Sequence, residues 1–305
     1  MKVIKISLES KIELEKPIVL GMGQFDGLHF AHMYIINKVI DDAKALNVSS
    51  AVVTFDPHPD YVLGKRKKEG YLTPLKEKKD ILADLGLDYL IVIKFSKEVA
   101  SLAYEKFEEL FLDKLNIKKV IVGFDYHYGK FASGSTETLK RKYNLEVIDE
   151  IKYEEIEVGS NLIRQYLEEG KVDKANYLLG RNYYIIGTVS KGSQIGTTLG
   201  FKTANISLDS SFYSLKFGVY AVIVSYGGNK YQAICNVGHN PSFNYQEKAR
   251  VEVHLFDFDK VIYDEQIKVE FIEFLREEQT YSSKEELMKQ INEDIKRTKG
   301  ILERK

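Results

Sequence analysis

The feature that most constrains this chain is a change of pattern near Gly180. Before that point, short apolar runs alternate with segments of helical periodicity, and after it β-rich runs follow one another with glycine or polar turns between them. Alternating strands and helices predict a parallel sheet covered by helices on both faces, whereas consecutive strands predict an antiparallel barrel or sandwich. A length of 305 residues also favours two domains, expected at residues 1–179 and 180–305.

The apolar runs of the first half are near-continuous, as expected for strands that are buried on both faces. These expected strands are residues 17–23, 50–55, 88–95, 118–124 and 145–149. The helices expected before Gly180 are residues 74–85, 104–115, 161–169 and 171–179. The strands expected after it are residues 183–190, 219–226, 230–237, 250–258 and 266–274. A capping box at Ser283 and Glu286 predicts a final helix.

Composition narrows the classes of function. The formal net charge of −1 provides no overall field for holding nucleic acid or anionic lipid. The basic run 65–68 is interpreted as a solvated loop or, alternatively, as a loop that faces phosphate. The single cysteine, Cys235, allows no intramolecular disulfide, which suits a reducing compartment. Residues 1–16 alternate and carry charge, so we expect neither a signal peptide nor a membrane span, and a cytoplasmic protein.

The stretch GQFDGLHFAH, residues 23–32, follows the first apolar run of the expected sheet. A strand end, a glycine-bearing turn and a helix start together make an anion site, because the first N–H groups of a helix lack intrahelical partners. His29 and His32 are three residues apart and can both face that anion. This predicts a site for a nucleotide α-phosphate, where imidazoles donate hydrogen bonds to developing charge. A zinc pair and a purely structural role are the alternatives.

The same stretch resembles the G-x-F-D-G-x-H-x-G-H signature of the bacterial riboflavin kinase/FAD synthetase family. Further segments match that family in order: TFDPHP (54–59), LTPLKEKKDIL (72–82), VGFDYHYGK (122–130), SNLIR (160–164) and LLGR (178–181). The resemblance implies a Rossmann-like nucleotidyltransferase domain that transfers AMP from ATP to FMN, giving FAD and pyrophosphate. It implies catalytic roles for His29 and His32 and a flavin contact from Asp56. The implied nucleotide contacts are Gly23, Phe25, Asp26, Gly27, Asp125, Ser160 and Arg164.

The second half contains a glycine-rich stretch, residues 187–208, that ends in a Thr-Ala-Asn triplet. Taken alone, it predicts a strand, a glycine loop and a second strand at a barrel corner. It also resembles the G-R-x-L-G-F-P-T-A-N segment of the riboflavin kinase module, which implies a riboflavin kinase-like barrel with Mg²⁺ on Thr203 and Asn205. Hydroxyl and amide oxygens are ligands that Mg²⁺ accepts, leaving room for waters and phosphates.

The resemblance further implies that Glu252 accepts the proton of the ribityl 5′-hydroxyl of riboflavin. Its alternative role is that of an outward-facing polar residue on an alternating strand. The implied nucleotide contacts are Gly192, Gly196 and Gly200, and the implied flavin contacts are Phe201 and Tyr220. Core packing is the alternative for these two aromatic residues.

Several positions depart from the family patterns. Ala31 replaces a glycine, His127 and Thr197 each replace an arginine, and Lys202 replaces a proline. The leading hypothesis is a bifunctional enzyme that phosphorylates riboflavin to FMN and adenylylates FMN to FAD, with Mg²⁺ as cofactor and ATP and flavins as substrates. Two alternatives stay open: only one half is active, with the kinase favoured, or the chain is a flavin- or nucleotide-binding regulator. The sequence predicts no oligomeric state.

Overall fold

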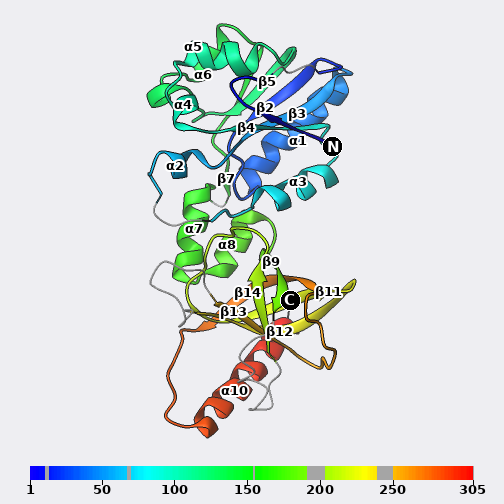
Figure 1. The fold of residues 1–305 in the computed structure, drawn as a ribbon, viewed down its shortest axis with the longest axis vertical. Coiled ribbons are helices and arrows are strands. Elements are labelled where there is room, and N and C mark those ends of the chain that lie inside the picture. The colour runs from blue at the N-terminus through cyan, green and yellow to red at the C-terminus, as the bar shows by residue number, and fades with distance from the viewer. Residues whose placement is uncertain (11–13, 67–69, 154, 191–202, 239–249, 305) are drawn as a thin grey trace. The chain divides into compact units, whose positions relative to one another are not determined.

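A computed structural model describes residues 1–10, 14–66, 70–153, 155–190, 203–238 and 250–304 (Figure 1). The chain divides into two compact units, Met1–Gly159 and Ser160–Lys305. The two helices expected just before Gly180 are present as α7 (Ser160–Glu169) and α8 (Val172–Leu179), and they belong to the second unit. The functional boundary expected at residue 180 stays a prediction.

The first unit is built on a parallel sheet of six strands in the order β1-β4-β3-β2-β5-β6. The strands are β1 (Lys2–Ile6), β2 (Ile18–Met22), β3 (Ser49–Asp56), β4 (Tyr89–Lys94), β5 (Ile117–Gly123) and β6 (Leu145–Ile148). The five strands expected from apolar runs are thereby confirmed. The sequence pattern did not predict β1, which carries charge, lies at the edge of the sheet and pairs only with β4.

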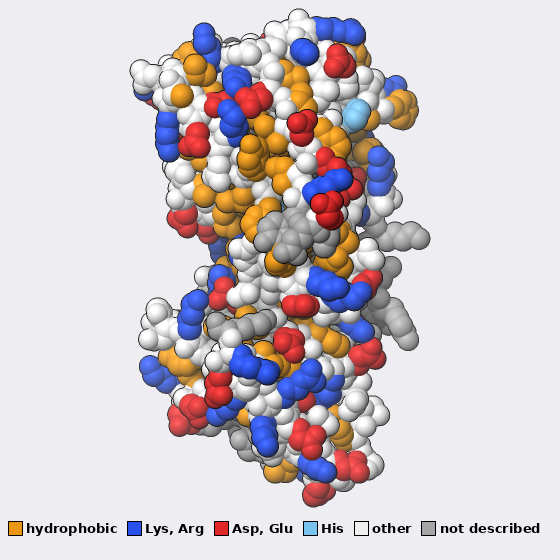
Figure 2. All heavy atoms as spheres, turned by 180° about the vertical axis from the view of Figure 1, so that it is seen from behind, with side chains coloured by type: hydrophobic (Ala, Val, Ile, Leu, Met, Phe, Trp, Pro, Cys, Tyr) orange, Lys and Arg blue, Asp and Glu red, His pale blue; other side chains and the backbone are white. Residues whose placement is uncertain are grey.

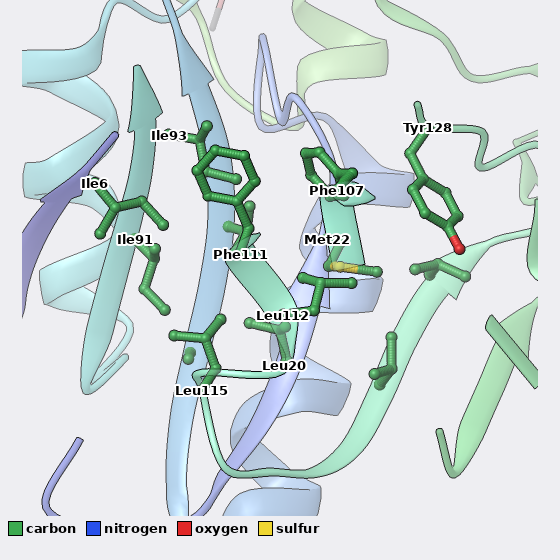
Figure 3. Packing of buried hydrophobic residues seen from close by; sticks show 14 of the residues in the cluster. Ile6, Leu20, Met22, Ile91, Ile93, Phe107, Phe111, Leu112, Leu115 and Tyr128 are labelled. Atoms are coloured by element: carbon green, nitrogen blue, oxygen red, sulfur yellow. The ribbon is translucent and has the colours of Figure 1, made fainter. Parts of the chain in front are cut away.

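Helices cover both faces of this sheet, as predicted (Figure 1). α1 (Phe30–Ala45) and α3 (Leu75–Asp84) pack on one face, and α4 (Lys97–Ala100), α5 (Tyr104–Phe107) and α6 (Thr136–Lys140) pack on the other. Successive side chains of a strand point to opposite faces of the sheet. In β2, Val19 therefore belongs to the core under α1, whereas Leu20 and Met22 belong to the core that contains Phe107 and Phe111 (Figure 3). The shorter elements are α2 (Pro59–Val62), η2 (Lys130–Ala132), β7 (Lys152–Tyr153) and β8 (Ile156–Glu157).

The helix expected at 104–115 is irregular. A single α-helical turn, α5, passes into a π-helical turn, η1 (Glu108–Leu112). In η1 the buried Glu108 carboxylate accepts a hydrogen bond from the Tyr128 hydroxyl. Local apolar periodicity does not encode this contact, because its partner lies on a distant part of the chain. The π-helical turn was therefore not predicted.

The second unit contains a closed antiparallel barrel with strand order β10-β13-β12-β11-β14-β9, which confirms the barrel rather than the sandwich. Its strands are β9 (Tyr183–Ser190), β10 (Ala204–Leu208), β11 (Gly218–Tyr226), β12 (Asn229–Gly238), β13 (Arg250–Leu255) and β14 (Gln266–Arg276). The final helix, α10 (Lys284–Leu302), packs Ile291, Ile295 and Ile301 over one outer face of the barrel. Ser283 caps α10, as expected, by accepting the Glu286 N–H at 3.2 Å.

A buried ion pair fixes α10 to the barrel. Arg276 Nη2 on β14 donates to Asp294 Oδ2 on α10 at 2.8 Å, and Arg276 Nε donates to the same oxygen at 3.0 Å. The described part of the chain has no helix that is long and apolar enough to cross a membrane. On the face shown in Figure 2, acidic and basic side chains are interspersed over each unit, as the balanced net charge predicts.

Candidate active sites

Residues expected to bind the nucleotide or the flavin gather at the carboxyl edge of the parallel sheet. Gly23 follows β2, Asp56 ends β3 and Asp125 follows β5, and these three strands are neighbours in the order β3-β2-β5. From β2 the chain runs outward to β3 and β4 on one side, and it then returns to β5 and β6 on the other side of β2. This edge beside β2 and β5 is therefore a topological switch point, where open α/β sheets bind their ligands.

The turn between β2 and α1 has an unusual backbone. Phe25, Gly27 and Leu28 all lie at positive φ, at +49°, +96° and +45°. Gly23 lies against the Phe25 ring, since a Cβ atom built on Gly23 would be 3.0 Å from it. Positive φ is costly for residues other than glycine, so the surrounding structure must hold this conformation in place. The turn ends at His29, which is the N-cap of α1.

The two histidines of the turn are brought together. The His29 and His32 rings stack with centroids 3.6 Å apart, and the Phe25 ring meets His32 edge-on at 5.2 Å. His29 is 3% exposed, whereas His32 is half-buried, so the pair reaches solvent at its His32 side. Their position at the N-terminus of α1 is the one predicted for an anion site. The described residues contain no group of three or more His, Cys, Asp or Glu side chains that could hold a metal ion.

Asp26 is the acidic residue of this turn, and its side chain fixes the turn to a neighbouring segment. Its side chain is buried, and Oδ1 accepts the Thr73 N–H at 3.1 Å. Arg66 Nη1 lies 4.0 Å from Asp26 Oδ2, and Arg66 Nη2 lies 3.3 Å from Asp60 Oδ2. Arg66 of the basic run is therefore tied to acidic groups near the turn. Phe25 is also fully buried, so direct nucleotide contacts from Asp26 and Phe25 stay predictions.

The two remaining acids of this edge are more accessible. Asp56 is half-buried and accepts a long hydrogen bond from the Tyr71 hydroxyl at 3.4 Å. Burial raises the pKa of Tyr71 to about 12, so its hydroxyl keeps its proton at neutral pH. Asp125 is exposed, and its backbone oxygen lies 2.8 Å from Nδ1 of the exposed His127. Both acids are placed where a ligand at the sheet edge could reach them.

Ser160 and Arg164 lie in α7, within the second unit. Arg164 is buried, stands over the Tyr213 ring at 5.7 Å and donates to Asn161 Oδ1 at 3.1 Å. Its guanidinium thus has partners inside the second unit. A contact of Ser160 or Arg164 with the nucleotide stays a prediction.

The candidate kinase site depends on strand register. Asn205 of β10 lies directly opposite Glu252 of β13, and Glu252 lies directly opposite Asn236 of β12. Directly opposed residues share a face of the sheet, and this face is the outer one, since Val251 and Val253 on either side of Glu252 are buried. The barrel therefore places a carboxylate and two amides in one row across three strands.

Other polar groups surround this row. Arg250 Nη2 donates to Glu252 Oε1, and the Glu252 side chain is 22% exposed. At the other end of the row, Asn236 Nδ2 donates to Glu278 Oε1 at 3.4 Å. A surface hollow of about 570 Å³ is lined by Glu278, Gln279 and Thr280.

The donor set fits Mg²⁺ in its chemistry. Thr203 is two residues before Asn205 and precedes β10, so an extended backbone would present both side chains on one face. The Asn205 amide oxygen lies in the same row as the Glu252 carboxylate. Oxygen donors with few protein ligands suit Mg²⁺ bound together with substrate phosphates.

Tyr220 lies inside the barrel rather than on this face. It is completely buried, its hydroxyl donates to the Lys216 carbonyl, and its ring meets Phe271 and Phe274 edge-on at 5.2 and 5.1 Å. This packing favours the core interpretation over flavin stacking. The predicted contacts Gly192, Gly196, Gly200 and Phe201, together with Thr197 and Lys202, lie outside the described residues.

Sequence reasoning missed several residues beside the two sites. Asn236 begins the segment NVGHNPSF, which resembles the N-x-G-x-x-P-T-F motif of the kinase module, but sequence reasoning assigned it no role in the site. Glu278 joins the row only through a loop contact, so no local motif identifies it. Lys78 was treated only as part of a helix, yet it is buried and bonds the turn before His29. The sequence offered one indication of this burial, namely a lysine at an inward-facing position of an amphipathic helix.

Comparisons with known proteins identify the two domains. A family model described as FAD synthetase matches residues 11–163, and one described as riboflavin kinase matches residues 179–302. A bifunctional riboflavin kinase/FMN adenylyltransferase of Bacillus subtilis is 36% identical over 283 residues and covers 90% of each chain. A protein of the same name from Buchnera aphidicola (subsp. Schizaphis graminum) is 35% identical over 304 residues and covers 97% of each chain.

A solved structure of a Streptococcus pneumoniae protein named "Macrolide-efflux Protein" matches with a TM-score of 0.87 and 29% identity, over 97% of this chain and 99% of that one. The family models define a two-domain protein with an FAD synthetase domain and a riboflavin kinase domain, and the parallel sheet and closed barrel agree with this division. The chain belongs to the bifunctional riboflavin kinase/FMN adenylyltransferase family.

Proposed function

We propose that this protein makes FAD from riboflavin in two ATP-dependent steps and that the two sites described above divide the chemistry. Riboflavin is phosphorylated to FMN on the barrel, and FMN is adenylylated to FAD at the edge of the parallel sheet. Family membership supports both activities. The single observation that carries the residue assignment of the adenylyl-transfer step is the stacked His29–His32 pair at the N-terminus of α1.

In adenylyl transfer, an oxygen of the FMN phosphate attacks the α-phosphorus of ATP. The new O–P bond forms as the bond to the bridging oxygen breaks, and pyrophosphate leaves. His29 and His32 would donate hydrogen bonds to the charge that develops on the α-phosphate oxygens, and the N-terminus of α1 would add its partial positive charge. Catalysis here is mostly positioning and electrostatic stabilisation, which a rigid turn supplies.

In the kinase step, the riboflavin 5′-hydroxyl attacks the γ-phosphorus of ATP and ADP leaves. Glu252 would accept the hydroxyl proton, since it is the carboxylate of the polar row on the outer barrel face. Thr203 and Asn205 would hold Mg²⁺, which when bound neutralises charge on the ATP phosphates. Arg250, which donates to Glu252, would orient that carboxylate.

A cytoplasmic location suits this proposal, since ATP is the donor in both steps and Cys235 is a free, buried thiol. One assay tests the proposal as a whole. Purified protein is incubated with riboflavin, ATP and Mg²⁺, and FMN and FAD are resolved by chromatography over time. FMN that appears first and is then converted to FAD supports two working sites. FMN alone would leave only the kinase, and bound flavin without either product would support the regulator.

A further inference from the structure

Lys78 is a buried cation that neither reaction described above uses. It lies on α3, is 2% exposed, and burial lowers its pKa to about 8, while the carboxylates of Asp26 and Asp56 offset part of that effect. A buried ammonium group is costly unless specific hydrogen bonds compensate it. The partners of Lys78 therefore indicate why a cation stands at this position.

Those partners converge on one carbonyl group. Lys78 Nζ donates to the Gln24 carbonyl oxygen at 2.7 Å and to Thr54 Oγ1 at 3.1 Å. Thr54 Oγ1 in turn donates to the same Gln24 oxygen at 2.8 Å. Side chains from α3 and β3 thus place two donors on a single backbone oxygen of the turn that follows β2.

The position of this oxygen determines how the turn begins. Gln24 directly precedes Phe25, the first of the residues at positive φ. In a trans peptide the C=O and the next N–H point in opposite directions. Fixing the Gln24 oxygen toward Lys78 and Thr54 therefore fixes the Phe25 N–H away from them. It also fixes the path of the chain toward His29.

We infer that Lys78 is a positioning residue for adenylyl transfer: its ammonium group, together with the Thr54 hydroxyl, holds the Gln24 carbonyl so that the turn presents His29 and His32 to the α-phosphate of ATP. This inference rests on the proposed function of that turn. Lys78 touches neither substrate. It acts through the backbone, and a displacement of about 1 Å in a catalytic turn can slow chemistry about 10²-fold.

The test compares Lys78→Met with Lys79→Met, a matched control on the same helix, using FMN, ATP and Mg²⁺ as substrates. We expect Lys78→Met to lower kcat for FAD formation about 10²-fold, with a change in the KM for ATP of less than about threefold. The rate of riboflavin phosphorylation by the same preparation should stay unchanged. Lys79→Met should match the wild type in both activities.

Thr54→Val provides a second variant, which keeps the shape of the side chain and removes its hydroxyl. We expect it to lower kcat about tenfold, and we expect the double variant to fall little below Lys78→Met alone, because both donors hold one oxygen. If both single variants keep the wild-type kcat for FAD formation, the inference is overturned even though wild-type FAD synthesis still stands. If Lys78→Met does not fold, an unchanged kcat in Thr54→Val overturns it. A wild type that makes no FAD would instead refute the proposed function of the turn.

Discussion

In the first unit, the residues proposed to act on ATP come from one continuous turn, whereas in the second they come from strands far apart in the chain. Residues 23–32 leave β2 and enter α1 directly, so His29 and His32 are neighbours in both sequence and space. Asn205, Glu252 and Asn236 meet only because β10, β13 and β12 pair in one register. A one-residue slip in that register would turn Glu252 toward the barrel interior.

This difference shows what protects each site. The first site depends on a strained backbone that hydrogen bonds of Asp26 and Lys78 hold in place. It should therefore be sensitive to substitutions of residues that do not contact a substrate. The second depends on a closed barrel in which every strand has two neighbours. The backbone that carries Asn205, Glu252 and Asn236 should therefore keep its position when one of these side chains is changed. Each of them should act more independently of the others than the residues of the turn do.

The largest expected effect is a loss of kinase activity, and it tests whether one side chain of the barrel row acts independently of the first unit. Glu252→Gln should lower riboflavin kinase activity about 10²–10⁴-fold, because general base catalysis contributes on that order. FAD formation from supplied FMN should be unchanged. Glu273→Gln, another outward glutamate of the barrel, is the matched control. A Glu252→Gln variant that kept the wild-type kinase rate would show that Glu252 is only a solvated strand residue.

The corresponding change in the first unit is His29→Ala. Loss of a preorganised hydrogen-bond donor should reduce FAD formation about 10²–10³-fold. The kinase rate of the same preparation serves as the control for folding, and FMN should accumulate when riboflavin and ATP are supplied. Equal loss of both activities would argue instead for general misfolding.

The next expected effect is a loss of stability in the second unit alone, which tests whether the two units unfold separately. Asp294→Ala leaves Arg276 partly buried without its carboxylate, which should cost about 3–5 kcal/mol. Chemical denaturation should show earlier unfolding, with kinase activity lost before FAD synthesis from FMN. Glu293→Ala removes an exposed neighbouring carboxylate and should change little. Simultaneous loss of both activities would mean that the two units do not unfold separately.

Lys78 makes the stability of the first unit depend on pH. Its pKa of about 8 in the folded protein lies below the ordinary 10.5, so the unfolded chain binds that proton more tightly. Stability should therefore rise between pH 8 and 10.5 in the wild type and not in Lys78→Met. The difference between these two pKa values corresponds to about 3 kcal/mol. Urea unfolding of both proteins at pH 7 and pH 10 measures the difference, and parallel pH dependences would contradict it.

The smallest effect concerns local backbone strain. Gly86 follows α3 at φ +82°, and a Cβ built there would meet no atom within 4 Å. Gly86→Ala should therefore cost about 1 kcal/mol from the left-handed conformation alone. Thermal unfolding checks the cost. A neutral substitution would mean that the loop relaxes around the added methyl group.

Much of the fold was predictable from local pattern. The apolar runs identified five strands of the parallel sheet, and the glycine-punctuated β pattern after Gly180 predicted an antiparallel barrel or sandwich, of which the structure is the barrel. The missed elements depend on distant partners. β1 is a strand because it pairs with β4, and Glu108 of η1 accepts a hydrogen bond from Tyr128, twenty residues further along the chain. Neither partner can be read from the segment itself.

The sequence by itself determined the two-part architecture, the glycine-bearing turn and the histidine spacing, because these depend on periodicity and on backbone preferences of single residues. Only the tertiary structure decided that Asn205, Glu252 and Asn236 form one row, that Tyr220 packs in the core, and that Lys78 lies under the turn. The physical reason is that strand register and the burial of a charge are set by contacts between segments distant in sequence, where local propensity carries no information.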